Sequence, residues 1–245
     1  MLRISLLLVI LSTQAYGQAL LSKVSHQVNK DGSVIILAEN LGVVPITVHL
    51  RATLTNMSSS VPLPAKLVVF PGKSPRIIAT FSPVKQWGNR YYYNADEHLG
   101  ICSGHKPDTI YRYGLPFRQP VTYKLGLGRR QNTSAADSSN LFFDLPANTP
   151  VLAAREGIVA QIKEDIAKNT RNPGQSNYII VFHDDGSYAW YQFLRKSSAT
   201  VAIGQRVAKG ELLAYSTDQK RLLPLWFAVL YPTDYGPKEV NLILE

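Results

Sequence analysis

Residues 140–157 read NLFFDLPANTPVLAAREG, and the neighbouring sequence is organised around this stretch. An apolar run at 141–143 leads through a polar turn with two prolines into a second apolar run at 151–154. Pro150 fixes its own φ and drives the residue before it, Thr149, to an extended conformation. We therefore predict a strand, a turn and a second strand here.

Short strand-like runs separated by turn signals continue on both sides. Upstream, residues 46–54 alternate polar with apolar side chains, and residues 90–93 form a further run with three tyrosines. Downstream, Gly186 follows two aspartates between apolar runs and can supply the positive φ of a hairpin turn. No helical period competes. The sequence predicts an all-β protein, with an N-terminal β-sandwich followed by an antiparallel β domain.

The N-terminus has the pattern of a secretory signal peptide. Arg3 precedes an apolar core at 4–11, and small residues stand at the −3 and −1 positions of a cleavage site before Gln18. No later run approaches about 18 apolar residues, so we expect no transmembrane segment after cleavage. We expect export to the periplasm or the extracellular space. The expected organisation is a signal peptide at 1–17, a β-sandwich module at 18–110 and a C-terminal domain at 111–245.

The formal net charge of +9 is unevenly distributed. Residues 18–118 carry 11 Lys/Arg against 5 Asp/Glu, whereas residues 119–245 carry 14 against 12. A basic first module favours contact with anionic envelope polymers or lipid headgroups. Nucleic acid is not an expected partner, because export separates the protein from it and no recognised binding motif is present.

Cys102 is the only cysteine, which excludes an internal disulfide and a structural cysteine-type zinc site. We expect it to be a small buried hydrophobic residue, with a reactive thiol or an intermolecular link as alternatives. A cysteine nucleophile paired with His98 or His105 is disfavoured, because the partners in such sites usually come from distant positions.

Four phrases in the second half resemble the lysostaphin/LytM-type zinc metallopeptidases, which cut peptidoglycan. They are TPVLAAREGIV at 149–159, NYIIVFHDDG at 177–186, VAIGQRVAKG at 201–210 and LWFAV at 225–229. The resemblance covers about residues 110–232 and implies the LytM-like fold, a duplicated hybrid motif. The first module resembles a β-sandwich that precedes this domain in some exported members.

The resemblance also implies a zinc site, held by two histidines and an aspartate. The His-x-x-x-Asp motif of the family falls on Ser138 and Phe142 when counted without gaps. With two residues deleted it falls on Asn140 and Asp144, which makes Asp144 a possible remnant of a ligand. The histidine of the first motif is missing in either alignment.

The two later motifs also lack their histidines. The family's Tyr-x-His-Leu falls on 191–194, where Phe193 stands at the catalytic histidine. Its His-Leu-His-Phe falls on 224–227, where Pro224 and Trp226 stand at the histidines. A catalytic zinc needs three N, O or S ligands plus an open position. We therefore expect no bound zinc, no other cofactor and no catalytic residue.

His183 is the one histidine of the second module, and its place before a predicted turn favours a surface residue at a strand end. It cannot rebuild a metal site by itself. The sequence thus predicts a pseudoenzyme of the cell envelope that regulates or positions peptidoglycan hydrolases by contacting a cell-wall amidase or another envelope protein. One alternative is a non-catalytic peptidoglycan-binding module. The other is a zinc metalloendopeptidase with rearranged ligands.

Overall fold

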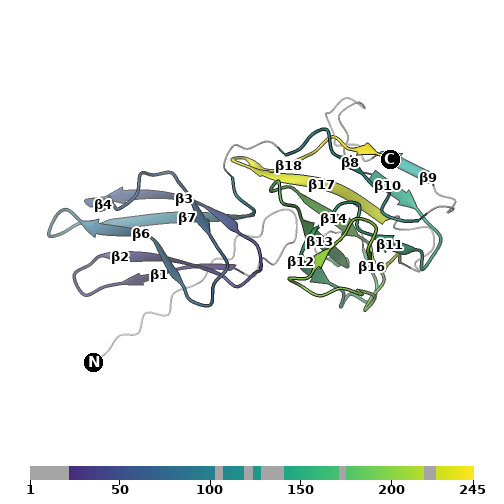
Figure 1. The fold of residues 1–245 in the computed structure, drawn as a ribbon. Helices are drawn as coiled ribbons and strands as arrows, with labels where there is room; N and C mark the ends of the chain where they lie inside the picture. Colours follow the sequence, from purple (N-terminus) through teal and green to yellow (C-terminus); the bar gives the residue numbers. More distant parts are fainter. Residues whose placement is uncertain (1–21, 103–106, 119–123, 128–140, 171–174, 218–224) are drawn as a thin grey trace. The chain divides into compact units, whose positions relative to one another are not determined.

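The computed structural model describes residues 22–102, 107–118, 124–127, 141–170, 175–217 and 225–245, with only the backbone for 124–127. The described chain divides into two compact units (Figure 1). The first holds residues 22–42 and 46–97, and the second holds 43–45 with the described residues from 98 onward. The predicted signal peptide at 1–17 lies outside the described residues, and the domain boundary at 110/111 stays a prediction.

The first unit is a β-sandwich of two antiparallel sheets, which confirms the predicted fold of this part. The strands of the four-stranded sheet are, in order, β1 (Ser22–Val28), β2 (Val34–Asn40), β6 (Arg76–Pro83) and β4 (Met57–Ser59). Those of the three-stranded sheet are β5 (Ala65–Val69), β3 (Ile46–Thr55) and β7 (Arg90–Leu99). Every second residue of β2 is buried, as expected for a strand with one face on a core. Ile36, Leu50 and Phe81 are fully buried between the sheets.

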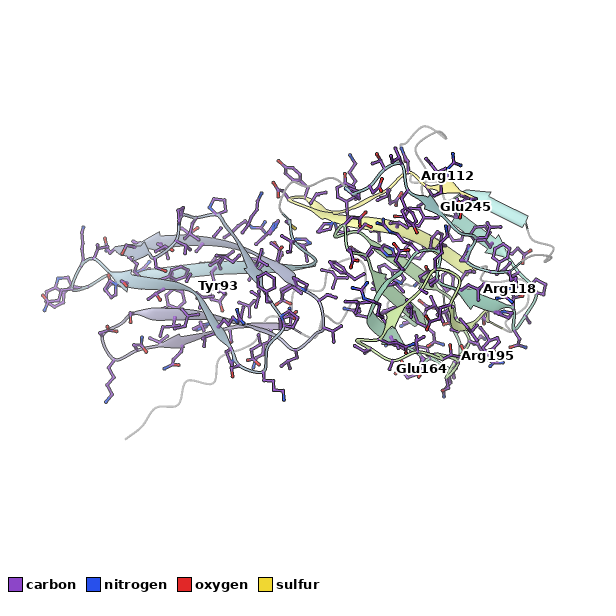
Figure 2. All side chains as sticks on the ribbon, in the orientation of Figure 1. Tyr93, Arg112, Arg118, Glu164, Arg195 and Glu245 are labelled. Carbon is purple, nitrogen blue, oxygen red and sulfur yellow. The ribbon has the colours of Figure 1, made fainter. Side chains whose placement is uncertain are left out.

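The tyrosine run lies in β7 and alternates across it. Tyr91 and Tyr93 are half-buried and pack on the core, whereas Tyr92 is 71% exposed. The hydroxyl of Tyr93 (labelled in Figure 2) lies 3.0 Å from Nδ1 of His26 in β1. The run is thus mainly structural, with one side chain left on the outer surface.

The second unit is built on an eight-stranded antiparallel sheet. Its order is β15 (Arg206–Val207), β12 (Gly157–Lys163), β13 (Tyr178–Phe182), β14 (Tyr188–Gln192), β17 (Leu225–Thr233), β10 (Leu141–Asp144) and β9 (Lys124–Leu127), with β18 (Gly236–Glu239) also on β17. Two small pairs complete it: β11 (Pro150–Leu152) with β16 (Leu212–Tyr215), and β19 (Ile243–Leu244) parallel to β8 (Arg112–Tyr113). The predicted all-β class with an antiparallel second domain is confirmed. Among the described residues, no helix is long and apolar enough to span a membrane.

The predicted strand, turn and strand at 140–157 are β10, the corner and β11. The corner is held through Thr149, whose backbone N–H donates to Ser216 Oγ at 2.9 Å and whose Oγ1 donates to Pro146 O at 2.7 Å. Gly186 has the predicted positive φ, 82°, in the turn between β13 and β14. The local turn chemistry is therefore as expected from the sequence.

Residues 107–118 dock their aromatic side chains on the second unit, as the glycine- and proline-rich sequence there suggests. Tyr113 and Phe117 belong to its core, and the Phe117 and Phe143 rings lie 5.2 Å apart. β8 runs beside β19, so Arg112 and Glu245 lie near each other (Figure 2). Cys102 is buried as predicted, with Sγ 3.7 Å from the Thr233 carbonyl oxygen.

Replacing Gly157 with alanine should destabilise the second unit. A Cβ there would lie 2.3 Å from Phe182 O and 2.8 Å from Val181 Cγ1, so two strands would have to move apart. We expect a loss of about 1–3 kcal/mol in the free energy of unfolding, measured by denaturant titration. Gly114→Ala is the control, because its Cβ would meet mainly the flexible end of Lys209. Equal stabilities of the two variants would contradict this interpretation.

Candidate functional site

Three residues lie in one row across the centre of the large sheet. Phe142 of β10 is the direct partner of Trp226 in β17, and Trp226 is the direct partner of Gln192 in β14. The neighbours along these strands, Tyr191 and Phe227, are fully buried in the core on the opposite face. Because side chains alternate between faces, the row lies on the face away from this core.

The row belongs to a larger aromatic layer, which we define as Phe142, Tyr178, Trp190 and Trp226. The rings of Trp226 and Trp190 lie 5.4 Å apart at 61°, and those of Trp190 and Tyr178 lie 5.4 Å apart at 66°. Trp190 and Tyr178 are buried, and burial raises the pKa of the Tyr178 hydroxyl. Phe142 and Trp226 are half-buried. The aromatic layer therefore reaches solvent at its Phe142–Trp226 edge.

Phe193 directly follows Gln192 and is buried in an unusual backbone conformation. Its φ is 66°, a region that costs about 1 kcal/mol or more for a residue with a bulky side chain. Its N–H donates to Asn177 O at 2.9 Å, and its carbonyl oxygen accepts from Thr217 N at 3.3 Å. The Gln192 side chain donates to Ser176 Oγ. The end of β14 is thus fixed by hydrogen bonds on both sides of Phe193.

Asp144 is exposed at the last position of β10, opposite Lys124. It is two residues from Phe142 and so shares its face of the strand. The other positions implied by the resemblance, Ser138, Asn140 and Pro224, lie outside the described residues. Of the positions implied by the resemblance, Phe142 and Trp226 lie side by side in the row.

The residues present do not fit a zinc ion of the family's type. Phe142 and Phe193 have no ligating atom, and the indole N–H of Trp226 is only a hydrogen-bond donor. Within the part of the chain that the structure describes, no three His, Cys, Asp or Glu residues form a group that could hold a metal. No hydrolytic step through a metal is derived for this arrangement.

His183 is fully buried, so the expectation of a surface histidine is wrong. Its Nδ1 lies 2.7 Å from the Glu156 carbonyl oxygen, which can only accept, so Nδ1 carries the proton. Burial lowers the pKa of His183 to about 4 and keeps the ring neutral at physiological pH. Among the described residues, its Nε2 has no hydrogen-bond partner.

Arg155 holds the neighbouring charges together. Its Nη1 donates to Asp185 Oδ2 at 2.8 Å and to the Tyr113 hydroxyl at 3.2 Å, and its guanidinium lies 4.0 Å from the centroid of the Tyr111 ring. Burial alone raises the pKa of Asp185, but hydrogen bonds from Ser187, the backbone and Arg155 outweigh burial and bring the pKa to about 2. Through these contacts Arg155 holds residues 107–118 against the rest of the same unit. No sequence signal singled out Arg155.

The model of peptidase family M23 matches residues 138–228. The matched region contains, except for the last residue of the fourth, the four phrases that resemble the lysostaphin/LytM-type metallopeptidases, so the resemblance of this part of the chain is confirmed. A search of curated proteins finds no match.

Solved structures of M23 proteins are similar to part or most of the chain. A mutant catalytic domain of the prophage-encoded M23 protein EnpA from Enterococcus faecalis is 16% identical, with a TM-score of 0.39, over 53% of this chain and 94% of that one. The catalytic domain of lysostaphin from Staphylococcus simulans is 20% identical, with a TM-score of 0.35, over 48% and 88%. A zinc-containing peptidase from Vibrio cholerae is 12% identical, with a TM-score of 0.37, over 89% and 84%.

Stability should depend on pH through His183. Its pKa is about 4 in the folded protein and about 6.5 when unfolded, so the unfolded chain binds the proton first as pH falls. The free energy of unfolding is therefore highest above about pH 6.5 and falls as the pH is lowered towards 4. The total loss from this one group is about 3 kcal/mol. His183→Gln should remove this slope, measured as the difference between the two unfolding profiles. If the free energy of unfolding fell equally steeply with pH in the wild type and in His183→Gln, the pH dependence would not come from His183.

Proposed function

We propose that this protein is an exported, non-catalytic M23 homologue that regulates or positions peptidoglycan hydrolases of the cell envelope. The observation that carries the proposal is the cross-strand pair Phe142–Trp226. Trp226 stands where the family's motif has a histidine, and Phe142 stands where it has the ligand aspartate when the motif is aligned without gaps. A site of this kind can bind a partner, but it offers no activated water.

The aromatic layer suits a protein partner because it is rigid and partly open. Trp190 is buried beneath Trp226, and the edge formed by Trp226 and Phe142 is half-buried. Tryptophan is enriched among the residues that dominate binding energy at interfaces, and strand-borne side chains lose little freedom on binding. The favoured partner is a cell-wall amidase or another envelope protein.

A second candidate function rests on the same half-buried Trp226. Indole and phenyl faces can stack on sugar rings, so the domain could bind peptidoglycan itself without cutting it. Retention on purified peptidoglycan in the absence of any protein partner would favour this second function over the first.

The purified protein should not cleave labelled peptidoglycan, with or without added zinc, and should contain no stoichiometric zinc by elemental analysis. The physical reason is that Phe142 and Trp226 supply no ligand. Lysostaphin serves as the active control in the same assay. Turnover above background that depends on zinc would instead establish the third alternative, a metalloendopeptidase with rearranged ligands.

Trp226→Ala should abolish stimulation of the cognate hydrolase, tested with purified candidate cell-wall amidases on labelled peptidoglycan. Removal of a central aromatic contact weakens binding at least about tenfold. Tyr235→Ala is the matched control, because Tyr235 is fully exposed in the same unit, at the β17–β18 turn. Thermal unfolding of both variants checks the fold, and Trp226→Phe should retain part of the activity. An unchanged stimulation by Trp226→Ala would exclude the aromatic layer as the contact.

A further inference from the structure

The chain that connects β6 to β7, together with the first residue of β7, is both apolar and basic. We call these residues, 84–90, the tip. Trp87 and Val84 are 75% and 65% exposed. Lys85 and Arg90 are exposed as well, and the tip contains no Asp or Glu. Exposed apolar side chains beside two cations form a surface that matches a partner with both apolar and anionic groups.

Asn56 forms hydrogen bonds with the backbone of the tip. It lies at the corner between β3 and β4 and has a φ of 54°. Val84 N donates to Asn56 O at 2.9 Å, and Asn56 Nδ2 donates to Gly88 O at 3.1 Å. Within the tip, Asn89 Nδ2 donates to Lys85 O at 2.9 Å. The loop is therefore ordered before any partner arrives, which lowers the entropy cost of binding through its side chains.

A third cation stands on the neighbouring turn between β1 and β2. The turn approaches the tip at Gly32, where a Cβ would lie 3.4 Å from Pro83 Cγ. Lys30 in this turn is exposed, whereas Asp31 is engaged by the backbone N–H and hydroxyl of Ser33. The carboxylate of Asp31 is thus engaged in its own turn. Positive charge predominates at this end of the sandwich.

We propose that the tip is a membrane-surface anchor that binds an anionic phospholipid bilayer. Trp87 and Val84 enter the headgroup region, where an indole ring is favoured because it is apolar with one polar N–H. Lys85 and Arg90 contact the lipid phosphates, with Lys30 beside them. Each cation near an anionic bilayer strengthens binding by about fivefold, and the inserted apolar side chains add to this attraction as a second signal. This proposal does not depend on the function proposed for the second unit.

The test uses the full chain without its predicted signal peptide and vesicles of phosphatidylcholine with or without phosphatidylglycerol. We expect co-sedimentation with the anionic vesicles only, weakened by added salt, together with a blue shift of tryptophan emission. Of the three tryptophans, Trp190 is already buried and Trp226 is half-buried in the second unit, so a blue shift that arises at the tip should disappear in Trp87→Ser. The double variant Lys85→Gln, Arg90→Gln should bind about tenfold or more weakly.

Phe70→Ser is the control. Phe70 is 50% exposed and follows β5, near Asn40 at the far end of β2, about 20 Å along the strand from the tip. It should bind vesicles as the wild type does. Absence of binding to anionic vesicles at low salt, or equal binding by Trp87→Ser, would overturn the proposal. Loss of peptidoglycan retention in Trp87→Ser without any vesicle binding would assign the tip to the wall polymer instead.

Discussion

The register between β14 and β17 is the constraint on which the second unit depends. Tyr191 pairs with Phe227, and the next pair along is Gln192 with Trp226. The first pair lies in the core, where the Tyr191 hydroxyl also accepts a hydrogen bond from Ala154 N at 2.8 Å. The second pair lies on the opposite face. A shift of one residue would exchange the faces and move Gln192 and Trp226 into the core in place of Tyr191 and Phe227. The core and the candidate site are therefore consequences of one register.

The aromatic layer is held by packing between rings and differs in this from a polar metal site. A metal site places several polar groups in a partly dehydrated pocket, and each must be paired or bound to the ion to offset its desolvation. Here the contacts from Tyr178 to Trp190 and on to Trp226 are between rings, each worth about 0.5–1.5 kcal/mol beyond the area buried. The same surface therefore contributes to stability and remains partly open at Phe142. Such a surface is compatible with the binding role proposed above.

Local sequence signals predicted the structure well, and contacts between distant residues did not follow from them. The proline corner at 149–151 and the glycine turn at Gly186 depend only on the backbone preferences of a few neighbouring residues. Both turns could therefore be predicted from the sequence. Motif order located Phe142 and Trp226, but only the strand register shows that they are direct partners. His183 was misjudged because its burial comes from a remote segment: the ring of Tyr113 lies 6.1 Å from it. No local pattern contains that information.

Arg155, Glu156 and Gly157, the last three residues of the stretch 140–157, join several parts of the second unit. Gly157 lets β12 approach β13 so closely that no Cβ would fit, and this approach brings His183 to the Glu156 carbonyl. Arg155 then joins Asp185 to the docked aromatic segment. A buried guanidinium is costly without a partner for its charge, so the ion pair with Asp185 and the contact with Tyr111 favour the docked position of this segment. Strands fixed in this way hold the side chains of the aromatic layer in place, and such preorganisation favours the binding of a partner.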